Sequence, residues 1–192
     1  SSQVGASKLA ISLGYDELKR TYLNFGFTKP ISLNFPSSAF GFMNFSDDIP
    51  QHSLASLGYG YGIKVSPYQL STAYSVFAND GILKDFKLLL SDKISSKRII
   101  SNQTASQTID ALKEVIKIGT GKKAYIKGYE VAGKTGTAHK IRNGDYADDL
   151  YQASFVGITP LSKNSLTIFV SIDEPGLNAY SGGTIAAPLF KV

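Results

Sequence analysis

The sequence contains no cysteine, only two histidines and no long hydrophobic run. Without cysteine the chain can form no disulfide, no thiolate zinc site and no covalent intermediate on a thiol. His52 and His139 lie far apart, and no cluster of metal-ligating residue types surrounds either of them. No segment approaches the ~18 consecutive apolar residues that a membrane-spanning helix needs. We therefore expect no metal centre, no cofactor and no membrane span within these residues.

Charge is modest and evenly spread. Lysine and arginine number 20 against 15 acidic residues, which gives a net charge of +5 and an isoelectric point near 9.2. The basic residues form only pairs, such as Lys97-Arg98 and Lys122-Lys123. A mildly basic face is suited to an anionic polymer, whereas nucleic-acid-binding surfaces usually gather their basic residues on one face or helix. We expect no nucleic-acid partner.

The 192 residues, 43% of them hydrophobic, are sufficient for one domain with a substantial core. The spacing of apolar and helix-capping residues predicts helices over residues 2–13, 16–26, 66–79 and 104–117. Ser2, Asp16 and Ser66 are the expected N-caps. Residues 28–50 have no clear period and are interpreted as a long connection.

Extended runs gather in the last third of the sequence, at residues 129–139, 153–159 and 166–172. Asn143-Gly144 is the strongest short hairpin signal in the chain. Helices first and strands last predict an α+β fold, in which an antiparallel sheet packs against helices.

The first of these runs contains V-A-G-K-T-G-T-A, the stretch that carries the most chemistry. Gly133 and Gly136 have no Cβ, so another backbone can lie close to this one. Lys134 supplies a cation, while Thr135 and Thr137 place hydroxyls on one face of a strand. Such a strand can hold an extended peptide through its main chain and bind the terminal carboxylate of that peptide. An ordinary strand with a surface lysine is the alternative interpretation, since short motifs have many false matches.

Five runs occur in one order along the chain: S-S-Q-V-G-A-S-K-L-A, then G-Y-G-I-K-V-S-P-Y-Q-L-S-T-A-Y, then G-T-G-K-K-A leading into V-A-G-K-T-G-T-A, then S-F-V-G-I-T-P, and finally Y-S-G-G-T-I-A-A-P-L-F. Together they resemble the transpeptidase domain of class B penicillin-binding proteins, most closely the division-type, septal enzyme. The signature of that family is S-x-x-K, S-x-N and K-T-G. Lys134-Thr135-Gly136 matches the third element, and Ser1-Ser2-Gln3 occupies the place of the second, with glutamine where asparagine is usual.

The first element is absent, because no serine is followed by lysine at the third position. We therefore expect the nucleophilic serine to lie upstream of residue 1. On this interpretation residues 1–192 are the C-terminal portion of one transpeptidase domain. That portion would be incomplete at both ends, lacking the S-x-x-K segment and the remainder of a final helix.

The resemblance implies a serine D,D-transpeptidase that cross-links peptidoglycan stem peptides ending in D-Ala-D-Ala and is acylated by β-lactams. It further implies divisome partners and an anchor in the cytoplasmic membrane, outside this chain, with the catalytic domain on the outer, periplasmic side. Ser1 and Lys134 would serve proton transfer, and the Thr137 backbone N–H would be half of an oxyanion hole. The substrate-binding residues that it implies are Gln3, Thr135, Gly136, Thr137, Tyr180 and Gly182.

Two other functions remain open from the sequence. A serine β-lactamase or a D-Ala carboxypeptidase also uses K-T-G, although no glutamate placed for deacylation is recognisable. A non-catalytic module of a division complex could instead use the strand edge only to dock a peptide. The isolated chain, without a nucleophile, is expected to be inert toward penicillin.

Overall fold

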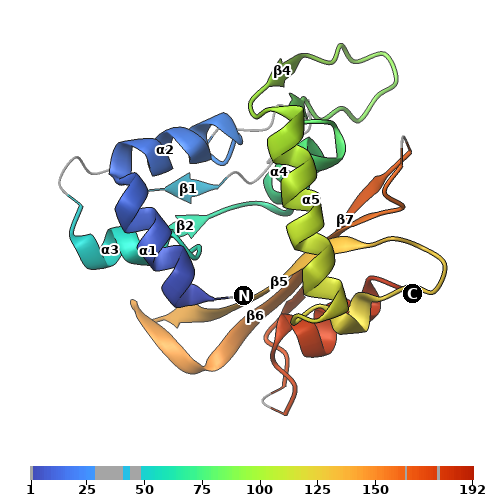
Figure 1. Ribbon diagram of the computed structural model, residues 1–192. Helices are drawn as coiled ribbons and strands as arrows, with labels where there is room; N and C mark the ends of the chain where they lie inside the picture. The colour runs from blue at the N-terminus through green and yellow to red at the C-terminus, as the bar shows by residue number, and fades with distance from the viewer. Residues whose placement is uncertain (1, 29–40, 44–48, 163, 177) are drawn as a thin grey trace. The chain divides into compact units, whose positions relative to one another are not determined.

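The computed structural model describes residues 2–28, 41–43, 49–162, 164–176 and 178–192 (Figure 1). The chain divides into two compact units, residues 1–73 with 83–99 and residues 74–82 with 100–192. Most of the connection predicted over residues 28–50 lies outside the described residues. In the part of the chain that is described, no helix has both the length and the apolar character required to cross a bilayer.

Three helices belong wholly to the first unit: α1 (Gln3–Leu13), α2 (Tyr15–Asn24) and α3 (Gln51–Leu57). The predicted cap of α1 is confirmed, since the Ser2 hydroxyl accepts a hydrogen bond from the Gly5 N–H at 3.1 Å. The prediction that Asp16 caps α2 is wrong. The helix begins at Tyr15, and Asp16 lies in its first turn, where a carboxylate still favours the positive end of the helix dipole.

Helix α4 (Pro67–Ala78) begins after Ser66, whose hydroxyl accepts a hydrogen bond from the Gln69 N–H at 3.3 Å, as predicted. Gln69 itself is buried, which its polarity did not suggest. Its amide oxygen accepts hydrogen bonds from the N–H groups of Gly41 and Ser66, and its amide nitrogen donates one to the Phe27 carbonyl. One buried side chain thus ties the start of α4 to two other segments of the first unit.

Two short strand pairs accompany the helices, and the first of them is antiparallel. Strand β1 (Phe42–Met43) pairs with β2 (Ile63–Lys64), and β3 (Ile82–Lys84) pairs with β4 (Ser96–Arg98). Among the described residues, a buried cluster in the first unit contains the side chains of Ala10, Leu18, Met43 and Leu57.

The second unit is built on one antiparallel sheet, in the order β5 (Ala132–Arg142), β6 (Asp145–Thr159) and β7 (Leu166–Asp173). The hairpin predicted at Asn143-Gly144 is confirmed. Both residues have positive φ, 55° and 94°, as a two-residue turn of the primed type requires. The α+β fold predicted from the sequence is confirmed as well.

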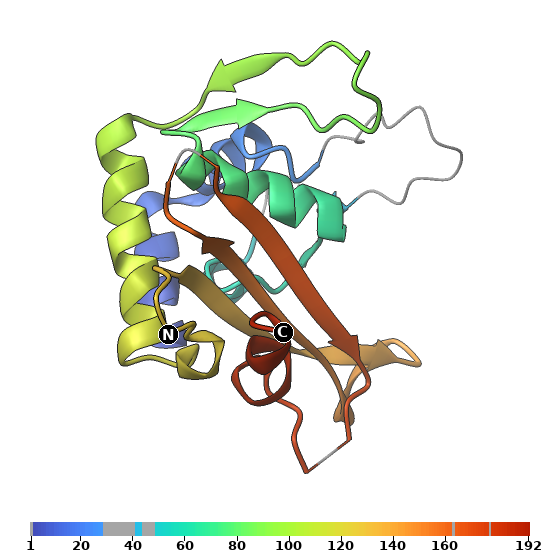
Figure 2. The same ribbon diagram turned by 90° about the vertical axis from the view of Figure 1, so that its right-hand side faces the viewer.

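Helical segments cover this sheet (Figure 2): α5 (Asn102–Lys117), the short η1 (Lys122–Ala124), and η2 (Gly182–Ala186) leading into α6 (Ala187–Leu189). The helix α5 starts two residues earlier than predicted, because the Ser101 hydroxyl accepts the hydrogen bond from the Thr104 N–H. The rings of Phe155 and Phe190 meet edge to face at 5.1 Å in the core between the sheet and these segments.

Candidate active site

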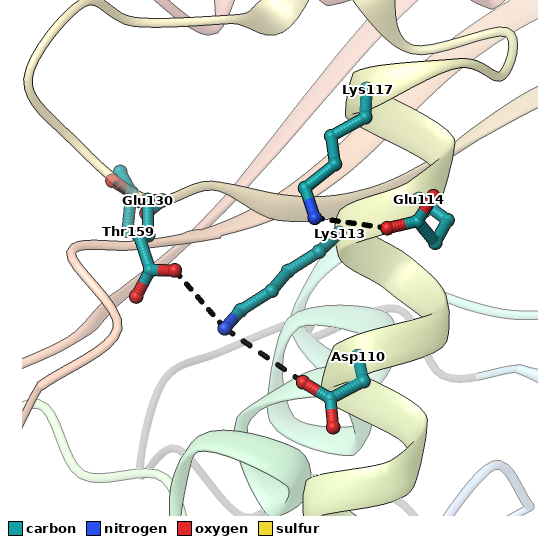
Figure 3. A network of polar contacts seen from close by, with 6 residues as sticks. All are labelled: Asp110, Lys113, Glu114, Lys117, Glu130 and Thr159. Carbon is teal, nitrogen blue, oxygen red and sulfur yellow. Dashed lines mark hydrogen bonds and ion pairs between the residues drawn. The ribbon is translucent and has the colours of Figure 1, made fainter.

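The motif strand β5 is held in place at its beginning by polar contacts around Glu130 (Figure 3). The Lys113 ammonium lies 3.2 Å from the Glu130 carboxylate, and the Thr159 hydroxyl donates to the Glu130 carbonyl at 3.1 Å. Lys113 comes from α5 and Thr159 from the end of β6. The helix and the neighbouring strand therefore fix the position at which the motif strand begins.

A side chain at either glycine of the motif would meet an atom of the neighbouring strand β6. A Cβ on Gly133 would lie 2.5 Å from the Phe155 ring and 2.7 Å from the Val156 carbonyl oxygen. A Cβ on Gly136 would lie 2.5 Å from the Ser154 hydroxyl. The close approach expected from these glycines is therefore present in the structure.

Thr137 and Gly182 meet, although 45 positions separate them in the sequence. The Gly182 N–H donates to the Thr137 hydroxyl oxygen at 3.0 Å. A Cβ on Gly182 would lie 2.2 Å from the Ser154 carbonyl oxygen and 2.4 Å from the Gly136 carbonyl oxygen. Gly182 thus brings the start of η2 directly onto the backbones of β5 and β6, and the structure places Gly136, Thr137 and Gly182 together.

The hydroxyl of Thr135 lies 2.6 Å from the hydroxyl of Thr120, in the turn that follows α5. Gly183 holds this turn close, since a Cβ there would lie 2.4 Å from the Thr120 carbonyl oxygen. Sequence reasoning gave Thr120 no role; the only signal was its place in the G-T-G run before the motif. Each hydroxyl of the pair retains hydrogen-bonding capacity, because a hydroxyl is one donor and two acceptors.

Lys134 is partly buried, and its ammonium donates to the Thr135 carbonyl at 2.9 Å. Burial lowers the pKa of Lys134 below the usual value for lysine, because desolvation disfavours the charged form. A lysine with a lowered pKa releases its proton more readily than a solvated one. Alternation along β5 directs Lys134 to one face of the sheet and Thr135 and Thr137 to the other.

An aromatic stack lies beyond the motif on the same pair of strands. The Tyr180 ring stacks on the Tyr151 ring at 4.2 Å, and the centroid of the His139 ring lies 4.6 Å from that of the Tyr151 ring. A ring nitrogen of His139, Nδ1, is 2.9 Å from the Ala147 carbonyl oxygen. Tyr180 was among the expected site residues, whereas Tyr151 was not. The contact of Tyr151 with His139 follows from the register of β5 and β6, which pairs these two residues.

The remaining expected residues belong to the other end of the chain. Ser1 lies outside the described residues, and Gln3 is the exposed first residue of α1 in the first unit. Among the residues that the structure describes, no three histidine or acidic side chains come together as metal ligands would.

The whole chain, residues 1–192, matches the family described as penicillin binding protein transpeptidase domain. It is 35% identical over 202 residues to the peptidoglycan D,D-transpeptidase FtsI of Buchnera aphidicola, and the match covers all of this chain but 34% of that protein. The chain thus spans about a third of the length of this curated relative.

Two solved structures are similar to it over 99% of its length. One is the apo transpeptidase domain of penicillin-binding protein 3 from Burkholderia pseudomallei, with 32% identity, a TM-score of 0.89 and 59% of that chain covered. The other is penicillin-binding protein 3 from Mycobacterium tuberculosis in complex with ampicillin, with 26% identity, a TM-score of 0.85 and 47% of that chain covered.

Proposed function

The chain belongs to the penicillin-binding protein transpeptidase family, and we propose that it is part of a division-type peptidoglycan D,D-transpeptidase. The observation that carries this proposal is the assembly of Thr137 with Gly182 and of Thr135 with Thr120 on the motif strand. In the three-stranded sheet described, β5 is an edge strand. Its outer backbone groups can therefore pair with an extended peptide, in the manner of β-strand addition.

The substrate is a stem peptide ending in D-Ala-D-Ala, held by its terminal carboxylate. The Thr137 hydroxyl accepts from the Gly182 N–H, so its own hydrogen is available to donate to a carboxylate. The Thr135 hydroxyl is held by a 2.6 Å hydrogen bond with the Thr120 hydroxyl, in which either oxygen can be the donor. Both hydroxyls lie on one face of β5, and a β-lactam carboxylate takes the same contacts. The solved complex of a similar protein with ampicillin supports this extension to β-lactams.

The reaction requires a nucleophilic serine with its lysine base, and no S-x-x-K occurs in residues 1–192. We assign both residues to a segment of the same domain outside this chain. That serine attacks the D-Ala–D-Ala amide and releases the last D-Ala, and the amine of a second stem peptide resolves the acyl-enzyme. Ser1 relays a proton to the leaving amine, Lys134 polarises this path, and the Thr137 N–H stabilises the oxyanion. Gln3 takes the place of the amide of the S-x-N element.

The proposal extends to the cellular setting through the relatives. A division-type enzyme of this family would be anchored in the cytoplasmic membrane, with this domain on the outer side and divisome proteins as partners. The net charge of the chain, +5, is suited to a substrate that is part of an anionic wall polymer.

Covalent labelling with fluorescent penicillin tests the proposal. The protein that combines this chain with an S-x-x-K segment is expected to be acylated, and the isolated 192-residue chain is not. Thr137→Ala in that protein is expected to slow acylation about ten- to a hundredfold, the effect of losing one hydrogen bond to a charged group of about 1.5–3 kcal/mol. Thr108→Ala removes a threonine whose hydroxyl bonds only within α5, and is the matched control.

Other outcomes identify the alternative functions. Rapid turnover of nitrocefin by the acylating protein would identify a β-lactamase. Release of D-Ala without cross-linked product would identify a carboxypeptidase. Peptide binding without any acylation would identify a docking module.

A further inference from the structure

Lys140, beyond the K-T-G motif on β5, joins two strands that are not neighbours. Its ammonium lies 2.8 Å from the Asp173 carboxylate and 2.7 Å from the Glu174 carboxylate. Asp173 ends β7, and β6 lies between β7 and β5. The Lys140 side chain therefore crosses β6, and it is only 29% exposed although both carboxylates are on the surface. We call this group of three residues the lysine clasp.

The clasp holds two irregular points of the backbone. The pairing of β5 with β6 is continuous to His139, which pairs with Tyr151, and resumes at Ile141, which pairs with Tyr146; Lys140 therefore lies opposite a bulge formed by residues 147–150 of β6. Bulges redirect the strand and its side chains, and are frequent beside active sites. At the other end Glu174 has a φ of +48°, an uncommon conformation for a residue other than glycine. The Glu174 N–H also donates to the Tyr151 carbonyl at 3.0 Å.

The connection that leaves β7 at Glu174 returns to the motif strand at Gly182, where its N–H bonds the Thr137 hydroxyl. Both ends of this connection are thus attached to β5. Glu174 is attached through the clasp at Lys140, and Gly182 is attached at Thr137, three positions before Lys140. Tyr180 lies near the second attachment and stacks on Tyr151, the residue whose carbonyl accepts from Glu174. The position of the Tyr180 ring therefore depends on both attachments.

We propose that Lys140 is a positioning residue that fixes Tyr180 at the rim of the site and so governs binding of ligands with bulky side chains. The inference rests on the proposed function. Loss of the Lys140 ammonium releases the Glu174 end, while Gly182 stays bonded to Thr137. The groups assigned to the carboxylate keep their places, and only the aromatic rim shifts.

The test compares acylation of the complete protein by two penams, one with a bulky aryl acylamino side chain and one with a free 6-amino group. Two partly exposed ion pairs contribute little each, so Lys140→Met is expected to lower the second-order acylation constant for the bulky penam about three- to tenfold. For the small penam the constant is expected to stay within about twofold. Lys140→Arg, which keeps the charge, should restore acylation by the bulky penam. Lys117→Met is the matched control, since it removes a lysine paired with Glu114 on α5.

Equal losses for both penams, no loss for either, or failure of Lys140→Arg to restore the bulky penam would each overturn the proposal. Amide hydrogen exchange provides a readout that does not need acylation. Lys140→Met is expected to accelerate exchange at the Glu174 amide and leave the Gly182 amide unchanged; an unchanged Glu174 amide would overturn the inference. If the wild-type protein is acylated by neither penam, the proposed function fails, while the exchange result still decides the role of Lys140.

Discussion

Gly182→Ala adds a methyl group at a point where two carbonyl oxygens leave no room. The new Cβ would lie 2.2 Å from the Ser154 oxygen and 2.4 Å from the Gly136 oxygen, about 1 Å inside the usual carbon–oxygen contact. Ser154 and Gly136 are paired across β5 and β6, so neither oxygen can retreat by a change of rotamer. Relief requires the start of η2 to rise from the sheet, which breaks the Gly182–Thr137 hydrogen bond.

Overpacking of this kind costs about 1–3 kcal/mol, and the lost hydrogen bond adds about 1 kcal/mol. We therefore expect Gly182→Ala to lower the free energy of unfolding by about 2–4 kcal/mol and the Tm by about 5–10 °C. In the protein that combines this chain with an S-x-x-K segment, acylation by penicillin should also slow at least about tenfold, because the Thr137 hydroxyl loses the group that orients it. Differential scanning calorimetry and the penicillin assay measure the two effects on the same sample.

Gly176→Ala is the matched control from the same connection. No atom lies within 4 Å of the position that a Cβ on Gly176 would take, and its φ is not positive. The Tm of the Gly176→Ala protein should therefore differ little from that of the wild type. A Gly182→Ala protein that melts and is acylated like the wild type would refute the reasoning, since the contact at Gly182 would then support neither the fold nor the site.

Two further predictions concern the helices. Gln69→Leu removes the hydrogen bonds to Gly41 and Phe27 and leaves a buried N–H unsatisfied. We expect it to lower the free energy of unfolding, measured with urea, by about 2–4 kcal/mol, whereas Gln103→Leu, at an exposed position, should lower it little. Burial raises the pKa of Tyr74 from its usual 10 to about 12, so the unfolded chain loses this proton first. The free energy of unfolding should therefore fall by about 2–3 kcal/mol as pH rises from 10 to 12. Tyr74→Phe should remove this fall. An absorbance titration of Tyr74 centred near pH 10 would contradict the prediction.

Local chemistry explains which parts of the fold the sequence predicted. A serine before an apolar helical stripe identified the starts of α1 and α4, and Asn143-Gly144 identified the β5–β6 hairpin. The start of α5 was misplaced because Ser101 and Thr104 are both acceptable caps, and only the backbone decides between them. The helix α3 was missed because its seven residues, Gln51–Leu57, are too few to show a period.

The site was predictable where its residues are contiguous and hidden where they are not. The glycines of the motif strand indicated a backbone that lies close to others, which the structure confirms; that its threonines bind a polar group stays a prediction. Thr120, Tyr151 and the lysine clasp were missed, because their partners lie 15, 29 and more than 30 positions away in the sequence. Such contacts depend on strand register and on the bulge of β6 opposite Lys140, neither of which a single sequence specifies.

The central claim is that this chain supplies the carboxylate-binding wall of a transpeptidase whose nucleophile lies elsewhere in the same domain. Peptide mapping after labelling with fluorescent penicillin tests it most directly, with the isolated 192-residue chain labelled in parallel. The prediction is a single adduct on the serine of an S-x-x-K element outside residues 1–192, and none on the isolated chain. An adduct on any serine within residues 1–192 would contradict the claim.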